Sequence, residues 1–263
     1  MGAKGCYVPG STPSGSQAWR ISSWSVWTTR QVMRAVARLG VACWRADPVK
    51  GADKQASNHG ISALKFQLVR EFLVLGYSVL LSDVDVVVLQ NPFGHLHRDH
   101  DVEALSDGFD ERTAYGGWDD VFDDPQMGWS RYAHTIRLFM VNSGLFYVRP
   151  SSRTVELMDR LTERLSREAA WDQAAFNEAL FLPSHGGYLS PRATVRVMDI
   201  YKFVNSKTLF KSLRGGRGSD ANRKPVMVHI NYHPDKWQRM KAVIKRYLKG
   251  DSHALDGYPL GVH

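Results

Sequence analysis

Apolar and polar positions alternate along this chain in blocks that predict helices followed by strands. Apolar residues recur at helical spacing from Ser62, whose hydroxyl suits an N-cap, to Gly76, which suits a helix end. The stretch over 77–89 is then apolar on both sides of a short polar point. We interpret this stretch as a buried strand that reaches a sheet edge, and the rest of the chain is expected to be organised around it.

The blocks before and after this stretch repeat the alternation of strand and helix. Residues 137–149 predict two buried strand pieces joined at Asn142-Ser143-Gly144, and Ser152 is the expected cap of the helix that follows. The polar, acidic segment 95–124 predicts loops, and residues 1–18 predict a disordered lead. The other predicted elements are helices over 29–39, 171–182 and 236–249 and strands over 41–44, 195–200 and 226–230. This order indicates an α/β fold with a mainly parallel sheet.

Two carboxylates stand at the polar point of the central stretch. Asp83 and Asp85 are separated by one valine, so in a strand both side chains would leave from the same face. Neighbouring carboxylates repel each other unless a metal ion, a Lys or Arg, or a raised pKa relieves the repulsion. Because carboxylate oxygens suit hard cations such as Mg²⁺ or Mn²⁺, we expect a metal–diphosphate site here. The plainer alternative is an acidic pair held by backbone amides or by a lysine.

The composition is that of a globular chain, and it narrows the classes of partner. The 263 residues are 43% hydrophobic and 23% charged, which is enough apolar content for one large α/β domain or two small ones. The net charge of +8 would suit nucleic acid, an anionic membrane or a phosphate-bearing substrate. No recognised motif accompanies the basic helix over 236–249, so we expect no nucleic-acid partner. The N-terminus has no signal-like core, and the two cysteines define no disulfide framework.

Four motifs occur in an order that resembles the nucleotide-sugar glycosyltransferases with the GT-A fold. Asp83-Val84-Asp85, after an apolar run, resembles the DxD motif of these enzymes. The motifs that come after it are Asn142-Ser143-Gly144, then Trp171-Asp172-Gln173 with Phe176-Asn177-Glu178, and finally His229 to Trp237. The DxD motif alone is a weak signal, and the order of all four makes the resemblance specific.

The chain is similar in more detail to the extensin arabinosyltransferases of plants and green algae, the "reduced residual arabinose" group of glycosyltransferase family GT77. The matching blocks include segments 64–66, 75–85, 89–93, 121–125, 128–129, 131–135 and 203–210. The resemblance implies a GT-A α/β domain with a mostly parallel central sheet over residues 45–256, followed by a tail over 257–263. Residues 1–44 contain no convincing equivalent of the family's first βα unit, so we expect that unit to be missing or altered.

The resemblance also implies a function. It predicts a metal-dependent, retaining glycosyltransferase that moves L-arabinofuranose from the donor UDP-arabinofuranose onto an arabinosylated hydroxyproline of a cell-wall glycoprotein. Relatives of this kind are type II membrane proteins of the Golgi lumen, and no membrane anchor or targeting signal is visible in this sequence. Two alternatives stay open: another pentosyl or galactosyl transfer within family GT77, and a truncated, inactive binding module.

The family pattern implies a metal site with three protein ligands. Asp85 would bind Mn²⁺ or Mg²⁺ directly, Asp83 would hold the metal or the donor ribose, and His229 would be the third ligand. His233 is a rival ligand close by in the sequence. The plainer interpretation of His229 is a hydrogen-bonded histidine at the end of a strand.

Other motif residues would contact the donor. Lys236 would reach the β-phosphate as a point charge. Lys65 would also meet the diphosphate, and a plain surface lysine explains it equally well. Asn142 and Gly144 would lie beside the donor sugar, where a glycine allows close approach of the backbone. The plainer interpretation of this motif is an ordinary turn between strands.

The candidate catalytic residues are Asp172 and Gln173. By resemblance, they would face the hydroxyl groups of the donor sugar and the acceptor. A carboxylate in the first turn of a helix is the competing explanation of Asp172, because the helix dipole favours it there. No dedicated nucleophile is evident, so departure and attack on the same face of the sugar would fit a retaining enzyme.

Overall fold

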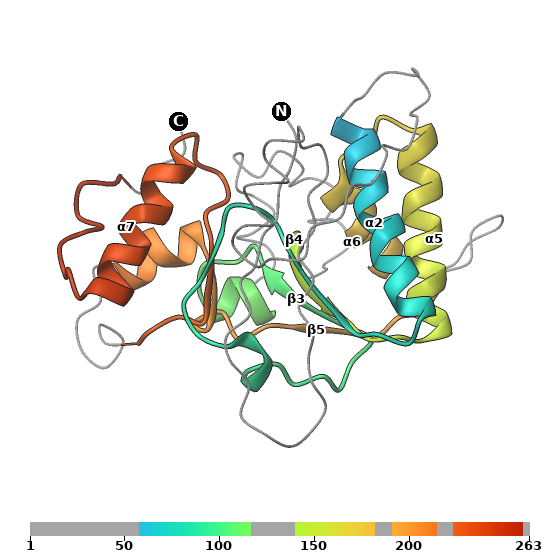
Figure 1. The fold of residues 1–263 in the computed structure, drawn as a ribbon, viewed down its shortest axis with the longest axis horizontal. Helices are drawn as coiled ribbons and strands as arrows, with labels where there is room; N and C mark the ends of the chain where they lie inside the picture. Colours follow the sequence, from blue (N-terminus) through green and yellow to red (C-terminus); the bar gives the residue numbers. More distant parts are fainter. Residues whose placement is uncertain (1–57, 117–139, 182–190, 215–222, 260–263) are drawn as a thin grey trace, which may run out of the picture.

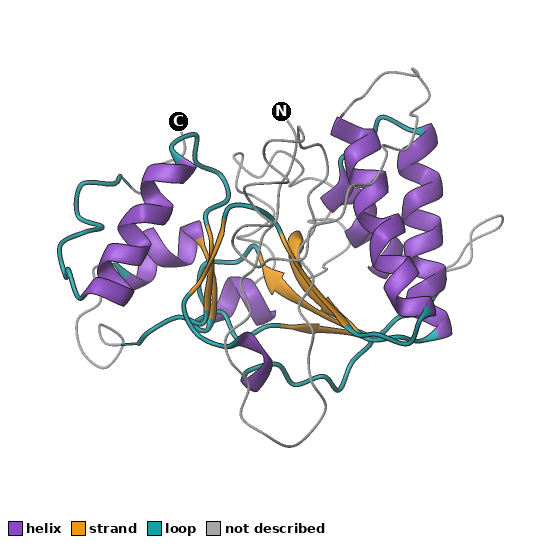
Figure 2. Ribbon diagram, viewed as in Figure 1, coloured by secondary structure: helices purple, strands orange, loops and turns teal. Residues whose placement is uncertain are grey.

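The structure is a computed structural model that describes residues 58–116, 140–181, 191–214 and 223–259 (Figure 1). Within these ranges, helices gather at one end of the molecule, another helix lies at the other end, and strands run between them (Figure 2). The disordered lead, the elements expected over 29–44 and the altered first βα unit all lie outside the described residues. None of the helices in the described ranges is long and apolar enough to cross a membrane.

The first helix leads directly to the central stretch. Helix α2 (Asn58–Val74) begins one turn before Ser62, the predicted cap. The apolar pattern marks where the buried face begins, whereas the backbone helix starts before it. Gly76 ends the helix as predicted, with a left-handed φ of 84°, and the Tyr77 amide donates a 2.9 Å hydrogen bond back to the Phe72 carbonyl.

The strands form two mixed sheets. One sheet has the order β1 (Val79–Ser82), β4 (Val141–Val148), β3 (Val102–Ser106) and β5 (Val195–Val197), and the other has the order β2 (Val86–Val88), β7 (Met227–His229) and β6 (Phe203–Asn205). Only the β3–β5 and β6–β7 pairs are parallel among these strands. The mainly parallel sheet is therefore wrong for the described residues. Helix–strand alternation predicts parallel neighbours only where a helix joins two strands of one sheet, and β1 leads without a helix into β2 of the other sheet.

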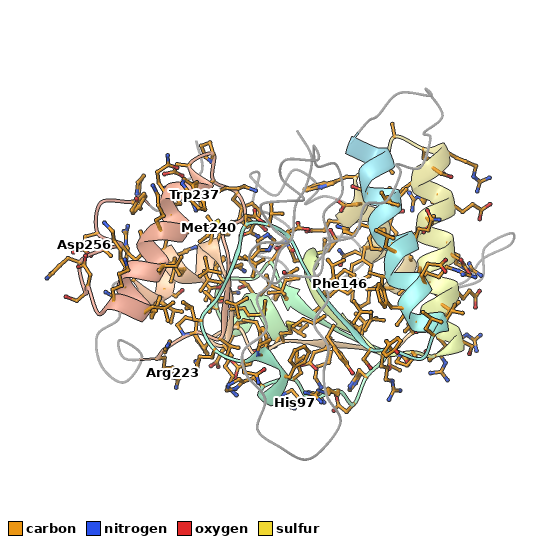
Figure 3. All side chains as sticks on the ribbon, in the orientation of Figure 1. His97, Phe146, Arg223, Trp237, Met240 and Asp256 are labelled. Atoms are coloured by element: carbon orange, nitrogen blue, oxygen red, sulfur yellow. The ribbon has the colours of Figure 1, made fainter. Side chains whose placement is uncertain are left out.

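Two of the sequence interpretations are corrected in the four-stranded sheet. Strand β4 is one continuous, fully buried strand and not two pieces joined by a turn. Strand β3 lies within the segment that was predicted as loops, and it too is buried along its whole length. Phe146 packs with the helices (Figure 3). Leu145 packs with residues of the second sheet. Because both faces of the sheet are covered, these strands lack the apolar–polar alternation of a half-buried strand.

Helices cover the two outer faces of the paired sheets. Helices α2, α5 (Ser152–Arg167) and α6 (Asp172–Phe181) share one apolar core with β3 and β4. Helix α7 (Lys236–Lys249) and the helical turn η4 (Thr208–Leu213) share another core with β2 and β7. The short helical turns η1 (Pro92–Gly94) and η2 (Arg112–Gly116) lie in the connections on either side of β3. The cap of α5 is Ser151 and not Ser152, since the Ser151 hydroxyl accepts the Thr154 amide.

Candidate functional site

The link between β1 and β2 carries the chain from one sheet to the other, and it holds both aspartates. On the β4 side, the Asp83 amide donates to the Gly144 carbonyl at 2.6 Å. On the β7 side, the Ile230 amide donates to the Asp85 carbonyl at 2.8 Å. The link is a turn and not the strand end that the sequence predicted. The two carboxylates come together because each sheet holds one end of this turn.

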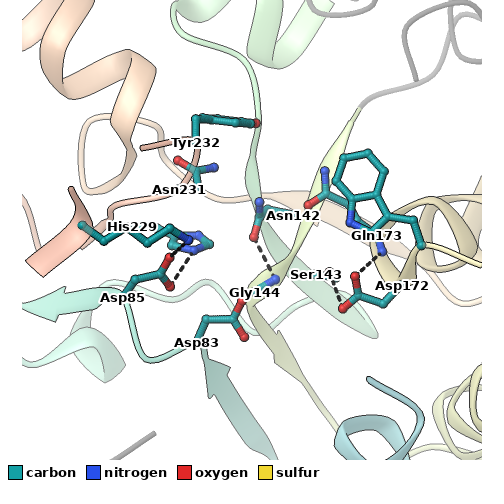
Figure 4. Close-up of a pocket in the computed structure, with 12 residues that line it drawn as sticks. Asp83, Asp85, Asn142, Ser143, Gly144, Asp172, Gln173, His229, Asn231 and Tyr232 are labelled. Carbon is teal, nitrogen blue, oxygen red and sulfur yellow. Dashed lines mark hydrogen bonds and ion pairs between the residues drawn. The ribbon is translucent and has the colours of Figure 1, made fainter. Parts of the chain in front are cut away.

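A polar pocket lies where the two sheets and the start of α6 meet (Figure 4). The residues that line it come from the β1–β2 turn, the first half of β4, the start of α6, the end of β7 and the start of α7. They are Asp83, Asp85, Asn142, Ser143, Gly144, Trp171, Asp172, Gln173, His229, Asn231, Tyr232 and Lys236. All four sequence motifs therefore contribute to one pocket.

Asp83, Asp85 and His229 form a cluster of metal-binding type. Each offers one ligand atom, and the three atoms lie within 4.8 Å of one another. His229 Nε2 is 3.1 Å from Asp85 Oδ1. The buried Nδ1 of His229 has no hydrogen-bond partner within the described residues, and a bound cation is one way to satisfy a buried imidazole. Two carboxylates and an imidazole at this spacing fit Mn²⁺ or Mg²⁺.

His233, the rival ligand, lies outside this cluster. Its ring packs edge-on against Phe210, with 5.4 Å between the ring centroids. Burial, with the nearby positive charges of Arg239 and Lys236, lowers the pKa of His233 to about 4. The three residues between His229 and His233 thus separate an imidazole in the pocket from one in the apolar core.

Lys236 lies at the start of α7 and reaches back to the acidic cluster. Its Nζ is 2.6 Å from Asp85 Oδ2. Burial alone would raise the pKa of the Asp85 carboxyl, but His229 and Lys236 outweigh it and hold this pKa well below its usual range. The Lys236 side chain is about half exposed, so its ammonium group can also meet a ligand in the pocket.

Lys65 and Asp172 form a second ion pair at the wall of the pocket, which Asp172 lines. Lys65 Nζ is 2.6 Å from Asp172 Oδ2 and donates to the Ser143 carbonyl at 3.1 Å. Burial opposes the charges of both groups, yet their attraction lowers the pKa of Asp172 and raises that of Lys65. Lys65 is therefore a partly buried, paired lysine and not a plain surface one. Asp172 also accepts the Gln173 amide at 2.9 Å, as a first-turn helix carboxylate does, and it still lines the pocket.

The sequence interpretation gave no role to several residues at the site. Asn231 and Tyr232 line the pocket just after β7, and Asp107 lies behind it at the end of β3. Burial raises the pKa of Asp107, although hydrogen bonds from Asn142, Tyr232 and Gln173 oppose this effect. The available signal for Asp107 was its position just after an apolar stretch, as it was for Asp83. The polar composition around β3 hid that strand, and Asp107 with it.

Comparison with known proteins identifies the class to which this fold and pocket belong. A family model described as nucleotide-diphospho-sugar transferase matches residues 30–242. The chain therefore belongs to the nucleotide-diphospho-sugar transferase family, and the resemblance predicted from the motifs is confirmed at this level. The mixed α/β fold agrees with this assignment.

Individual relatives are plant enzymes. The chain is 56% identical over 225 residues to "Arabinosyltransferase RRA2" and 51% identical over 222 residues to "Arabinosyltransferase RRA1", both of Arabidopsis thaliana. These alignments cover 84% and 83% of this chain, and 52% and 54% of the relatives. It is also 29% identical over 215 residues to an Arabidopsis thaliana "UDP-D-xylose:L-fucose alpha-1,3-D-xylosyltransferase", covering 76% of this chain and 52% of that protein. The chain thus spans about half the length of the curated relatives it matches.

Proposed function

We propose that this chain is the catalytic domain of a metal-dependent, retaining glycosyltransferase. Its donor is UDP-arabinofuranose, and its acceptor is an arabinosylated hydroxyproline of a cell-wall glycoprotein in the Golgi lumen. The observation that carries the proposal is the cluster of Asp83, Asp85 and His229 in the pocket of a nucleotide-diphospho-sugar transferase. The choice of arabinose rests on the two relatives named as arabinosyltransferases, and the furanose form rests on the family resemblance of the sequence.

The acidic cluster and Lys236 would hold the diphosphate end of the donor. Asp83, Asp85 and His229 are the residues that would bind Mn²⁺ or Mg²⁺. A divalent cation at such a site neutralises negative charge on a departing diphosphate. The Lys236 ammonium lies at the same cluster, and its partial exposure leaves it able to pair with a phosphate oxygen.

The sugar would lie on the other side of the pocket, against Asp172, Gln173 and the start of β4. Transfer breaks the bond between the anomeric carbon and the diphosphate oxygen, forms a bond from that carbon to an acceptor hydroxyl, and releases the hydroxyl proton. The ion pair with Lys65 keeps Asp172 ionised, so its carboxylate accepts hydrogen bonds from sugar hydroxyls. Asn142 and Gly144 border the same space. The diphosphate would thus lie on one side of the pocket and the sugar on the other. This arrangement supports departure of the diphosphate and attack by the acceptor hydroxyl on the same face of the sugar.

Titration calorimetry with UDP, in the presence and absence of Mn²⁺, tests the metal–diphosphate part of the proposal. We expect binding that needs Mn²⁺ and that Asp85→Ala removes. Asp159→Ala, on the exposed face of α5, is the matched control and should bind as the unaltered chain does. Metal-independent UDP binding, or no binding by a folded chain, would contradict this part and favour the inactive binding module.

Transfer assays then test the sugar. The chain is incubated with Mn²⁺, an arabinosylated hydroxyproline peptide, and UDP-arabinofuranose, UDP-xylose or UDP-galactose. We expect product from UDP-arabinofuranose. Xylose transfer would instead support the second candidate, which the similarity to the UDP-xylose-dependent relative favours.

A further inference from the structure

Asp107 connects several side chains of the pocket without lining the pocket itself. It follows β3, and only 1% of its surface is exposed. Its Oδ1 accepts from Asn142 Nδ2 at 3.0 Å and from Asn231 Nδ2 at 3.4 Å. Its Oδ2 accepts from Gln173 Nε2. These amides come from β4, from the segment after β7 and from α6, so one buried carboxylate joins three separate elements.

The two asparagine amides are also fixed from their other ends. Asn142 Oδ1 accepts the Gly144 amide at 2.7 Å, and Asn231 Oδ1 accepts the Ser206 amide at 3.1 Å. A backbone N–H can only donate, so each asparagine must turn its oxygen toward the backbone and its NH₂ group toward Asp107. The orientations of Asn142 and Asn231 would therefore survive a change at Asp107.

Gln173 has no such second restraint. Its Oε1 makes no hydrogen bond within the described part of the chain, and its NH₂ group is held by Asp107. Because Asp107 lies behind the pocket and Gln173 lines it, the NH₂ group points away from the ligand space and the carbonyl oxygen is the end left for a ligand. The hydrogen bond to Asp107 thus decides which end of this amide faces the pocket.

We propose that Asp107 is a positioning residue that turns the Gln173 carbonyl oxygen toward the substrates, where it accepts a hydrogen bond from a sugar hydroxyl. The ligand class, a sugar of the donor or of the acceptor, rests on the proposed function. The orientation of Gln173 does not, because the contacts within the chain set it.

Asp107→Asn tests this role with little change of shape. The new side chain keeps one oxygen, which Asn142 and Asn231 require, and places its NH₂ group opposite the NH₂ group of Gln173. Two donors cannot bond, so the Gln173 amide turns over and presents a donor to the pocket. We expect kcat for transfer to fall by about a hundredfold. The affinity for UDP with Mn²⁺ should stay within about twofold, since the metal cluster is untouched.

Asp101→Asn is the matched control. Asp101 precedes β3 as Asp107 follows it, is also 1% exposed, and accepts the Thr194 amide at 3.0 Å and Arg149 Nε at 3.2 Å. It does not line the pocket. We expect Asp101→Asn to lower the Tm while kcat stays unchanged. If kcat falls with Tm in the same proportion in Asp101→Asn as in Asp107→Asn, the loss of activity only reflects lost stability. That result would overturn the positioning role.

A second measurement is independent of catalysis. In a chain labelled with ¹⁵N, the NH₂ signals of Gln173 should show slow exchange with solvent, and Asp107→Asn should remove this protection. Asp101→Asn should leave it in place. Unchanged Gln173 signals in Asp107→Asn would overturn the inference. If the unaltered chain neither binds UDP nor transfers sugar, the proposed function fails while these signals still decide the role of Asp107.

Discussion

The Asp83 carboxylate occupies the space that a side chain at position 144 would need. A Cβ built on Gly144 would collide with Asp83 Oδ2 and would lie 2.7 Å from His229 Cε1. Real Cβ atoms essentially never approach other atoms so closely. The glycine of the Asn-Ser-Gly motif is thus what allows two ligands of the candidate metal cluster to pack against β4.

Gly144→Ala should therefore damage the metal site. The added methyl group must push Asp83 or His229 away, which separates ligand atoms that now lie within 4.8 Å of one another. We expect the affinity for UDP in the presence of Mn²⁺ to fall at least about tenfold, as for other changes that misplace metal ligands. Calorimetry measures this loss.

Gly94→Ala provides the control for that substitution. Apart from its two chain neighbours, no described residue has an atom within 4 Å of a Cβ placed on Gly94, so the same chemical change has room there. Gly94→Ala should bind UDP as the unaltered chain does. An alanine at position 144 that leaves metal-dependent binding intact would show that the cluster does not hold the metal.

The two histidines after β7 provide a second test of the metal cluster. His229 lies with the aspartates, whereas His233 packs against Phe210. His229→Ala should abolish Mn²⁺-dependent UDP binding, because it removes one of the three ligands, the imidazole that lies 3.1 Å from Asp85 Oδ1. His233→Ala should keep this binding, although it leaves a cavity that lowers the Tm. The reverse pattern in calorimetry would identify His233 as the ligand.

The amphipathic helices could be predicted closely from the sequence, and the central strands could not. The bounds of α7 are those predicted, because its apolar positions recur at helical spacing against a charged face. Strand β3 was missed because the charged residue Glu103 is part of it. The Glu103 carboxylate is buried and accepts the backbone amides of His97 and Arg98, at 3.0 and 3.1 Å to Oε2. Only the tertiary structure reveals such partners, so the residue appeared to be a loop residue.

The candidate site, too, could be predicted only in part from the sequence. Its motif residues could be found because each lies directly at the end of an apolar stretch or at the start of a helix. The partners of those residues could not be found. Nothing local indicates that Lys65 pairs with Asp172, or that Asp107 joins three amides, because these contacts span 107 residues in the first case and up to 124 in the second.

The Lys65–Asp172 pair should contribute more to stability than a surface pair on the same helix. Both groups are largely buried, so Lys65→Met leaves the Asp172 carboxylate without its cation in a poorly solvated place. We expect a loss of about 3 kcal/mol in the free energy of unfolding. Arg70, also on α2, pairs with Asp159 at the surface, and Arg70→Met should cost less than about 1 kcal/mol. Urea denaturation of both variants measures the difference, and equal losses would refute a special role for the inner pair.

The buried imidazole of His233 should make stability depend on pH. Its pKa is about 4 in the folded chain, against an ordinary value of 6.5. The groups that act on it are Arg239 and Lys236, whose charges lower this pKa, and Asp235, which raises it. Between these two pH values, the unfolded chain binds a proton at this position and the folded chain does not. The free energy of unfolding therefore falls as the pH drops from 6.5 towards 4, by about 3 kcal/mol from this residue.

His233→Gln isolates this contribution, because glutamine does not titrate in this range. Urea denaturation of both chains at intervals between pH 4 and 7 gives the two free energies of unfolding. Other groups titrate in both chains and cancel in the difference. The variant should be less stable than the unaltered chain near pH 7, where a neutral imidazole packs well against Phe210. The gap should narrow as the pH falls, since only the unaltered chain loses stability through His233. Two curves that stay parallel would mean that His233 takes up its proton as readily in the folded chain as in the unfolded one.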